Sequence, residues 1–529
     1  MRRFHSYGPV DCEEHFCVPR RALVEHCIEQ LVGQPNKKGH YFTVWAPRQT
    51  GKTWLMHQVV QEIQERYGDR FILGTLSMQE VVVEEESSLE RFLEVVPLLI
   101  LNGFDREIET PKSWEEWTDL FHQRAGLFDR PVLLFIDEFD SLPPRVIDRL
   151  VALFRGMHLK RQRYLLHGLG LIGVRAVLGV ESERGSPFNI QRSLHVPNLT
   201  REEVVDLFDQ YQEESGQAVD SAVVGQVFRA TRGQPGLVSW FGELLTETYN
   251  PGEGRPIDLP TWELVYGRAR RVEWNNTLLN LIKKARGTYL PHVMELFNHS
   301  NIEFSLRTDW CSYLYLNGII DFERGKGAKG EDTDVCRFSS PFVQQCIYQA
   351  LTYDLVGDRT AILALEPLDD LADVFGGPRL DLPALLRRYK DYLVRLEARG
   401  LDPWKEQPRR RKDLRLTEAV GHFHLYTWLH NALGRRCVVS PEFPTGNGKV
   451  DLHLRCEKGR GIIEVKSFRD IYEARESVKQ AAQYGRDIGV EEVTLALFVP
   501  VKDEEVLAKL SWEEAVEGVK VTVVAIGWA

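Results

Sequence analysis

Three residues in the last hundred of the chain have the types and the spacing that metal-dependent hydrolysis requires. Asp451 lies in one short apolar run, and Glu464 and Lys466 lie two residues apart in the next. Because side chains alternate between the two faces of a strand, Glu464 and Lys466 point to the same side. If the two runs are neighbouring strands in matching register, Asp451 joins them. Two carboxylates can hold Mg²⁺ and a neighbouring lysine can orient a water, so the pattern predicts phosphodiester hydrolysis.

The surrounding sequence predicts the elements that would position these residues. A turn over residues 458–461 joins the two strands, and an opening helix is expected over Glu418–Leu433. After the strands comes a helical pattern that contains Gln480 and Tyr484. These two residues are four apart and therefore share one helix face. The order helix, strand, strand, helix predicts an α/β domain over 414–529.

A second pattern, near the other end of the chain, has the features of a nucleotide-phosphate site. An apolar strand over Tyr41–Trp45 runs directly into a short loop and then a helix. Such a loop surrounds phosphate oxygens with backbone N–H groups and the positive end of the helix dipole. We expect Lys52 to reach the terminal phosphates and the Thr53 hydroxyl to bind Mg²⁺. The loop comprises Ala46, which replaces the usual glycine, Pro47, Arg48, Gln49, Thr50, Gly51, Lys52 and Thr53.

An acidic strand end completes this nucleotide pattern. The run Val132–Ile136 is apolar throughout and is followed by Asp137 and Glu138. We expect Asp137 to support the Mg²⁺ ion and Glu138 to position the attacking water. Further strands are predicted at Phe71–Ser77 and Ala176–Val180, which makes residues 41–200 typical of an α/β parallel sheet.

Length and composition limit the remaining choices. A chain of 529 residues has room for three or four domains. Its hydrophobic content of 43% and its lack of a long apolar run or an apolar leader favour a cytoplasmic protein with no membrane partner. Eight scattered cysteines predict reduced thiols and no zinc site. The net charge of −11 argues against general nucleic-acid binding. A local basic patch can nevertheless bind nucleic acid, because binding depends on the local charge. The basic run at 409–412 is either such a patch or a solvated linker.

The N-terminal motifs resemble the AAA-like or STAND-type P-loop ATPases of prokaryotes. The resemblance covers about residues 15–250 and rests on the loop at 46–53 and the acidic strand end at 136–140. Residues 178–190 resemble the sensor region of that family, and the turn ending in Pro235 resembles its helical-lid turn. The resemblance implies that ATP is the nucleotide and that a lid, with Pro235 against the base, closes on it.

The middle of the chain resembles a winged-helix module. A helix around Leu314 leads into two strands that end near Phe322 and Phe338. The loop between these strands carries Arg324, Lys326 and Lys329. Such a module either contacts DNA or forms a rigid part of the ATPase lid. Both alternatives remain open at the level of sequence.

The C-terminal motifs resemble the PD-(D/E)XK nuclease superfamily over about residues 414–500. Asp451 matches its aspartate, preceded by Val450 in place of proline, and Glu464 and Lys466 match its E-x-K motif. The resemblance implies that Mg²⁺, with Mn²⁺ as the alternative ion, is held by Asp451, Glu464, the carbonyl of Val465 and Glu418. It implies that Lys466 positions the water, and that Gln480 and Tyr484 support the metal or grip phosphate. The histidines at 422, 424 and 430 are interpreted as packing or surface residues, since Mg²⁺ prefers oxygen ligands.

The complete prediction is an α/β chain with a P-loop NTPase parallel sheet, a helical lid and a winged helix, followed by a PD-(D/E)XK nuclease-like domain. The expected boundaries are 1–200, 201–255, 256–352, a linker with a helix at 353–413, and 414–529. The expected activity is ATP-controlled, Mg²⁺-dependent hydrolysis of DNA. The sequence leaves open whether the chain forms a homo-oligomer, and whether the setting is genome defence, repair or the processing of mobile elements. The alternatives are a STAND-like switch, or a DNA-binding regulator with ATPase activity, whose nuclease fold does not cut.

Overall fold

The computed structural model divides the chain into two units: residues 1–274 with 316–318, and residues 275–315 with 319–529. The structure describes all residues except 9, 34–38, 48, 80, 82–87, 174–191, 253, 298–300, 328–330, 357–363, 370, 377–379, 406, 408–416, 434–435, 443–450, 457–458, 488 and 529, and excludes the side chains of 88, 192, 353–356, 442, 451 and 487. Within these described ranges, none of the helices has the length and apolarity needed to cross a membrane.

The first unit is built on a five-stranded parallel sheet with the strand order β2-β3-β4-β1-β5. Every residue of β3 is buried, as expected for a strand covered on both faces. The predicted strands at 41–45, 71–77 and 132–136 are confirmed to within one residue. A strand at Leu166–Gly173 was not predicted, and the expected strand at 176–180 lies outside the described residues. The strands are β1 (Tyr41–Trp45), β2 (Ile72–Ser77), β3 (Val132–Asp137), β4 (Leu166–Gly173) and β5 (Arg192–His195).

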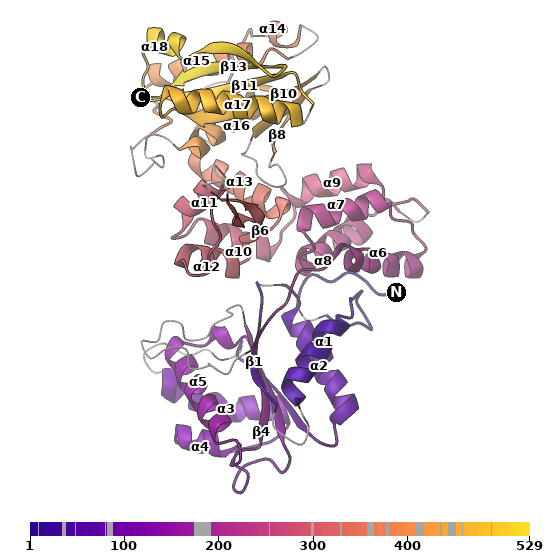
Figure 1. The fold of residues 1–529 in the computed structure, drawn as a ribbon. Helices are drawn as coiled ribbons and strands as arrows, with labels where there is room; N and C mark the ends of the chain where they lie inside the picture. Colours follow the sequence, from indigo (N-terminus) through magenta and orange to yellow (C-terminus); the bar gives the residue numbers. More distant parts are fainter. Residues whose placement is uncertain are drawn as a thin grey trace. The chain divides into compact units, whose positions relative to one another are not determined.

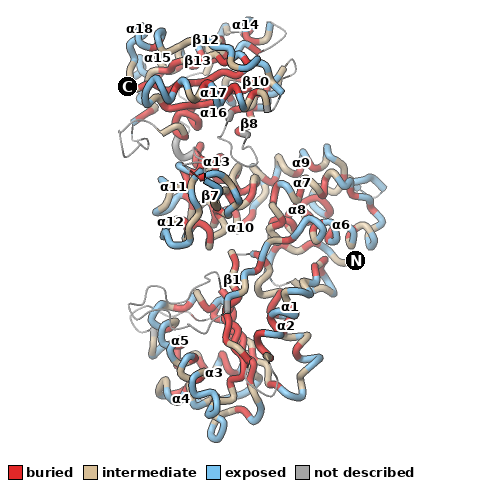
Figure 2. Tube along the Cα trace, viewed as in Figure 1, coloured by how far each residue is buried: buried red, intermediate tan, exposed pale blue. Residues whose placement is uncertain are grey.

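Helices cover both faces of this sheet (Figure 1). The helices α1 and α2 pack on one face through Ile28, Leu55 and Val59, whereas α3 and α5 pack on the other through Val96 and Phe154. Burial is concentrated in the strands and in the inward faces of the helices (Figure 2). The helices are α1 (Arg21–Val32), α2 (Lys52–Tyr67), α3 (Ser88–Phe104), α4 (Trp114–Asp119), the 3₁₀ turn η1 (Phe139–Ser141) and α5 (Pro144–Leu159).

A helical segment follows the sheet in the first unit. Thr200 and Glu203 form a reciprocal capping box that starts its first helix. At the turn before α8, Gly233 has φ 72°, and a Cβ atom there would lie 2.0 Å from the carbonyl oxygen of Leu199, so the close approach requires glycine. The elements are α6 (Arg201–Ser215), α7 (Ser221–Thr231), α8 (Pro235–Glu243), the π-helical turn η2 (Leu244–Thr248) and α9 (Leu259–Ala269).

The second unit begins with a small helical domain that carries an antiparallel hairpin. The hairpin strands pair from Ile320 with Phe338 to Lys326 with Asp332. Asn275 caps the first helix by accepting hydrogen bonds from two backbone N–H groups. The elements are α10 (Asn276–Ala285), α11 (Leu290–Leu296), α12 (Asp309–Leu316), β6 (Ile320–Lys326), β7 (Asp332–Phe338) and α13 (Pro341–Val356).

A six-stranded sheet with the order β12-β13-β11-β10-β9-β8 forms the C-terminal part of the second unit. Alternate residues of β11 pack on opposite faces: Phe498 beneath α15 and α16, and Leu497 beneath α17. The predicted opening helix is confirmed at Glu418–Leu433. The elements are α14 (Ala372–Phe375), α15 (Leu382–Ala398), α16 (Glu418–Leu433), β8 (Cys437–Glu442), β9 (Asp451–Cys456), β10 (Gly459–Ser467), α17 (Ile471–Asp487), β11 (Glu492–Val499), α18 (Glu504–Lys509), β12 (Trp512–Val516) and β13 (Val519–Gly527).

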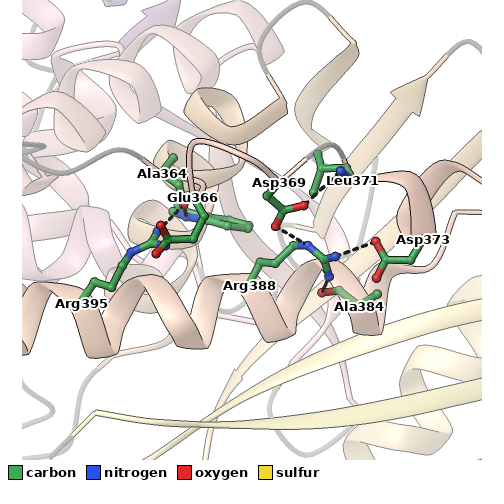
Figure 3. A network of polar contacts seen from close by, with 9 residues as sticks. Ala364, Glu366, Asp369, Leu371, Asp373, Ala384, Arg388 and Arg395 are labelled. Carbon is green, nitrogen blue, oxygen red and sulfur yellow. Dashed lines mark hydrogen bonds and ion pairs between the residues drawn. The ribbon is translucent and has the colours of Figure 1, made fainter.

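The segment before α16, which the sequence suggested is a linker, packs against the C-terminal sheet. Arg388 of α15 binds the carboxylates of Asp369 at 2.7 Å and Asp373 at 2.6 Å (Figure 3). Arg395 binds Glu366 and the carbonyl of Ala364 in the same network. Residues of α15, such as Leu385 and Tyr389, belong to the same hydrophobic core as Leu452 and Ile463 of the sheet. We therefore propose that the C-terminal domain begins near residue 364, and not at 414.

The expectation that all thiols are reduced is wrong for four of the eight cysteines. Cys12 pairs with Cys17, and Cys437 pairs with Cys456. The second disulfide joins residues that lie directly opposite each other on β8 and β9. The sequence did not indicate this pairing, because a separation of 19 residues places the two cysteines together only after β8 and β9 have paired.

Candidate functional site

The phosphate loop of the first unit has the geometry that its sequence predicted. Gly51 adopts φ 83° immediately before α2 begins at Lys52. The Lys52 ammonium donates hydrogen bonds to the carbonyl oxygens of Ala46 at 2.9 Å and Pro47 at 2.7 Å, and the Thr50 hydroxyl also donates to Pro47. In this structure the Lys52 side chain therefore contacts its own loop. It would have to leave these carbonyl oxygens in order to bind a phosphate. Arg48 lies outside the described residues.

The loop and the acidic strand end meet directly. The Thr53 hydroxyl donates a hydrogen bond to Oδ2 of Asp137 at 2.8 Å, across 84 residues of sequence. Asp137 is buried at the end of β3, whereas Glu138 is exposed and has φ 50°. Thr53 and Asp137 thus supply two adjacent oxygen groups suited to Mg²⁺. Glu138 is the carboxylate directed away from the core, as a water-positioning residue would be.

The turn that begins α8 contacts the phosphate loop. The Gln234 side chain and the backbone N–H of Gly236 both donate to the carbonyl oxygen of Gln49, at 3.3 and 3.2 Å. Pro235 is the first residue of α8, where its missing N–H costs no hydrogen bond. The sequence placed Pro235 near a nucleotide, but the contact between this turn and Gln49 emerges only from the fold.

One residue beside the loop was missed by the sequence analysis. His195 ends β5, lies opposite Trp45 in the sheet, and places its ring 4.6 Å from the Trp45 ring. Desolvation of the ring, followed by the nearby charge of Lys52, lowers the pKa of His195. The imidazole is therefore neutral at pH 7 and adds no charge to the phosphate site. The sequence around His195, which is followed by the apolar Val196, contains no motif that would have pointed to this residue.

The three C-terminal residues lie on neighbouring strands in the predicted register. Strand β10 pairs antiparallel with β9, and Glu464 lies directly opposite Asp451. The predicted turn is shorter than expected, because β10 already begins at Gly459 and only residues 457–458 separate the strands. The backbone of Asp451 is described but its side chain is not. The opposed positions allow Asp451 and Glu464 to approach within a few ångströms.

A buried cluster of charges surrounds Lys466. Its ammonium lies 2.7 Å from Oε1 of Glu464 and 3.8 Å from Oε2 of Glu418. Glu464 and Lys466 are only 3% and 4% exposed. Burying two ions costs desolvation energy that their attraction rarely returns in full, so this pair is weak evidence for a role in stability. A chemical role explains its place in the domain better.

Helix α17 brings the two remaining predicted residues to the same domain. The Tyr484 hydroxyl and Nε2 of His453 form a hydrogen bond of 3.0 Å, and His453 lies two residues beyond Asp451 on β9. Gln480 is exposed on the same helix. Tyr484 therefore contacts β9 at His453, two positions along the strand from Asp451.

The histidines of α16 divide as the sequence analysis expected. His430 is exposed, while His422 and His424 are buried. Burial, with a smaller effect from the charge of Lys466, lowers the pKa of His422 to about 3. Burial lowers the pKa of His424 to about 4. Both imidazoles are therefore neutral near pH 7.

The hairpin of the helical domain is less basic than its sequence suggested. Arg324 pairs with Asp334 at 3.3 Å, and Lys326 pairs with Asp332 at 2.8 Å. Lys329 and the basic run at 409–412 lie outside the described residues. The paired acids reduce the positive charge that this hairpin could offer to a phosphate backbone.

Comparison with known proteins addresses the first unit. Residues 5–248 match the family model of the AAA-like domain. This part of the chain is an AAA-like P-loop ATPase domain. It contains the phosphate loop, Asp137, Glu138 and the turn before α8. Such domains bind ATP, usually with Mg²⁺. No curated protein matches the chain.

Solved structures resemble the chain at low sequence identity. The Walker-type ATPase PABY2304 of Pyrococcus abyssi is 16% identical, with a TM-score of 0.42, over 65% of this chain and 99% of that chain. The Aeropyrum pernix ORC1 protein, solved in complex with DNA, is 15% identical over 64% and 94% of the two chains, with a TM-score of 0.34. The Thermotoga maritima RuvB Holliday junction branch migration motor is 13% identical over 60% and 92%, also with a TM-score of 0.34.

The contact between the AAA-like domain's loop and the turn before α8 leads to a testable prediction. A Cβ atom at Gly236 would lie 2.5 Å from Oε1 and 3.0 Å from Cβ of Gln49. Gly236→Ala should therefore push the loop and the turn apart and weaken ATP binding by roughly 10-fold, the factor that corresponds to 1.4 kcal/mol. The measurement is a fluorescent-nucleotide titration.

Gly225→Ala is the matched control for this substitution. Gly225 lies within α7, and no atom comes within 4 Å of a Cβ placed there. We expect this variant to bind ATP normally and to gain a little helix stability. Equal nucleotide affinity in the two variants would contradict the proposed contact.

The described side chains of the C-terminal cluster suit a hard metal ion. Glu418 and Glu464 offer carboxylate oxygens, which Mg²⁺ and Mn²⁺ both accept. Among the described residues, no three histidine, cysteine or acidic side chains form a ready metal cluster. Asp451 would supply a third carboxylate, but its side chain is not among the described residues. Asp451, Glu464, Glu418 and the carbonyl of Val465 are the groups that would hold the ion.

Proposed function

We propose that the chain is an ATP-controlled, metal-dependent nuclease that hydrolyses DNA phosphodiester bonds. The observation that carries this proposal is the buried contact of Lys466 with Glu464 and Glu418, on a strand where Glu464 lies opposite Asp451. Burying a lysine with the carboxylate of Glu464, close to that of Glu418, is an expensive arrangement in a protein interior. The arrangement is useful if the carboxylates hold a divalent ion and the lysine orients a water molecule.

In the proposed reaction, water attacks phosphorus and one P–O ester bond breaks. The products are a phosphate monoester and a hydroxyl group, and the proton from water passes to the leaving oxygen through solvent. Asp451 and Glu464 would hold the metal, and Lys466 would orient the water and offset developing negative charge. Gln480 and Tyr484, on α17, contact the phosphate backbone. A Mg²⁺ ion held there would supply Lewis-acid polarisation of the phosphate.

The AAA-like domain supplies the proposed control by ATP. Lys52 would leave the carbonyls of Ala46 and Pro47 for the terminal phosphates. Thr53 and Asp137 would share the Mg²⁺ ion of the nucleotide, and Glu138 would position the water for hydrolysis. The turn at Gln234–Gly236 is hydrogen-bonded to Gln49 of the phosphate loop. A change in that loop on nucleotide binding would therefore move the turn. We infer that ATP favours cutting, through an assembly of several copies that brings nuclease domains together on both strands.

One comparison of substrates tests this proposal directly. The full chain is incubated with linear duplex, circular duplex and single-stranded DNA and with RNA, with and without Mg²⁺ and ATP. We expect Mg²⁺-dependent cutting of DNA that Asp451→Ala lacks. Binding without cutting in every condition would instead support a switch whose nuclease fold only binds. A footprint at one defined sequence, again without cutting, would support a DNA-binding regulator.

A further inference from the structure

Helix α16 carries two histidines that each bond a buried tyrosine from another helix. Nδ1 of His422 lies 2.5 Å from the hydroxyl of Tyr348, which belongs to α13 of the helical domain. Nδ1 of His424 lies 2.6 Å from the hydroxyl of Tyr389, which belongs to α15. Both tyrosines are fully buried, with pKa values raised well above 10 by that burial, so both hydroxyls keep their protons. The two pairs are chemically alike.

The two pairs differ in what surrounds the imidazole. His424 packs against the ring of Trp404 at 4.9 Å, and burial alone accounts for its lowered pKa. His422 instead lies one turn after Glu418 on α16, and the Lys466 ammonium is 3.8 Å from Oε2 of Glu418. The charge of Lys466 also contributes to the lowered pKa of His422. Among the described residues, its second ring nitrogen, Nε2, is buried and makes no hydrogen bond. A buried polar nitrogen without a partner is costly and therefore requires an explanation.

The contacts of Lys466 suggest that explanation. In the structure its ammonium is held by Oε1 of Glu464 at 2.7 Å. If Glu464 turns that oxygen to a metal ion, the ammonium loses its nearest partner. An imidazole nitrogen with a free lone pair can accept a hydrogen bond from an ammonium group. Nε2 of His422 has such a lone pair if the ring proton sits on Nδ1 and is donated to the Tyr348 hydroxyl.

We propose that Tyr348 and His422 are positioning residues of the nuclease site, with Tyr348 fixing the imidazole and Nε2 of His422 receiving the ammonium of Lys466. This inference rests on the proposed nuclease function. It makes the helical domain a contributor to the site, since Tyr348 lies outside the residues that resemble a nuclease.

The packing between α13 and α16 supports such a contribution. Besides its bond to His422, the ring of Tyr348 lies 4.6 Å from Phe423 and 5.4 Å from Tyr426 of α16. The ring of Phe297, the residue that follows α11, lies 5.9 Å from the ring of Phe423, measured between ring centroids. Aromatic contacts of this kind hold the two helices in one orientation. A displacement of α13 would therefore move His422 and, through it, Lys466.

The test compares Tyr348→Phe with Tyr389→Phe in the full chain. Each substitution deletes one buried hydroxyl and keeps the ring, so the losses of stability should be similar. We expect Tyr348→Phe to lower kcat for Mg²⁺-dependent DNA cleavage by about 10-fold or more, as removal of a group that orients a site residue commonly does. The KM for DNA and the rate of ATP hydrolysis should not change. Tyr389→Phe should keep the wild-type kcat.

A second readout does not depend on cleavage. In the ¹⁵N-histidine spectrum of the full chain, assigned with His422→Asn, the wild-type His422 should carry its proton on Nδ1. A proton on Nε2 would overturn the inference whatever the activity. Equal kcat in the two tyrosine variants would also overturn it and leave the proposed function intact. If the wild type cuts no DNA, the proposed function fails, and the inference fails with it.

Discussion

Lys466→Met should reduce Mg²⁺-dependent DNA cleavage by on the order of 10²–10⁴-fold, the range typical for losing a group that assists proton transfer or orients a nucleophile. The substitution keeps the apolar stem and removes the ammonium that lies 2.7 Å from Glu464. Binding of DNA should persist, because Gln480, Tyr484 and the metal ligands remain. Single-turnover cleavage of a linear duplex, with the DNA affinity measured in Ca²⁺, separates the two effects.

Stability has to be controlled in this comparison. Removing Lys466 leaves Glu464 buried without its nearest cation, which can cost about 3–5 kcal/mol. The assays therefore belong well below the melting temperature of the variant. Lys520→Met is the matched control, since Lys520 also lies on a strand and pairs with an acid, Glu513, at 3.0 Å. If Lys466→Met folds and cuts as fast as Lys520→Met, Lys466 has no catalytic role.

The AAA-like domain should separate ATP binding from ATP hydrolysis when two residues are changed one at a time. Lys52→Ala should abolish hydrolysis and weaken nucleotide binding, because it deletes the ammonium beside the phosphate loop. Glu138→Gln should keep nucleotide and hydrolyse it slower by about 10²–10³-fold, because only the water-positioning carboxylate is lost. Thr53 and Asp137 remain hydrogen-bonded and available to Mg²⁺ in both variants.

Steady-state phosphate release and nucleotide titration measure these two properties. Glu115→Gln is a suitable control, since Glu115 is an exposed acid of α4 whose nearest cation, Arg149, is 3.7 Å away. Unchanged turnover in Lys52→Ala would refute the assignment of the phosphate loop. Loss of nucleotide binding in Glu138→Gln would show that Glu138 has a structural and not a water-positioning role.

Local sequence patterns predicted the parts of the fold that short-range rules determine. The apolar run before Asp137 indicated a buried parallel strand, and the two-residue spacing of Glu464 and Lys466 indicated a shared face. The register of Asp451 with Glu464 followed from a tight turn between two short runs, although that turn proved shorter than expected. Periodicity and turn chemistry carry this information within about 20 residues.

Long-range partners could not be predicted in the same way. Tyr348 is 74 residues from His422, and neither residue belongs to a recognisable motif. The disulfide of Cys437 and Cys456 and the contacts of Arg388 with Asp369 depend on pairings made only after the sheet and α15 have packed. The segment at 353–413 was predicted to be a linker with a helix, but its residues Asp369 and Asp373 pair with Arg388 of α15. Composition alone could not predict these ion pairs, because they form only when the segment packs against α15.

The most direct test of ATP control is the rate at which the full chain cuts one linear duplex in Mg²⁺ across nucleotide states. A ligand shifts a conformational equilibrium only through its different affinities for the two states. Glu138→Gln, loaded with ATP, should cut faster than Lys52→Ala under identical conditions, and wild-type protein should cut faster with ATP than without it. Asp451→Ala defines the background. Equal rates in all of these nucleotide states would contradict ATP control and leave two activities that share only a polypeptide.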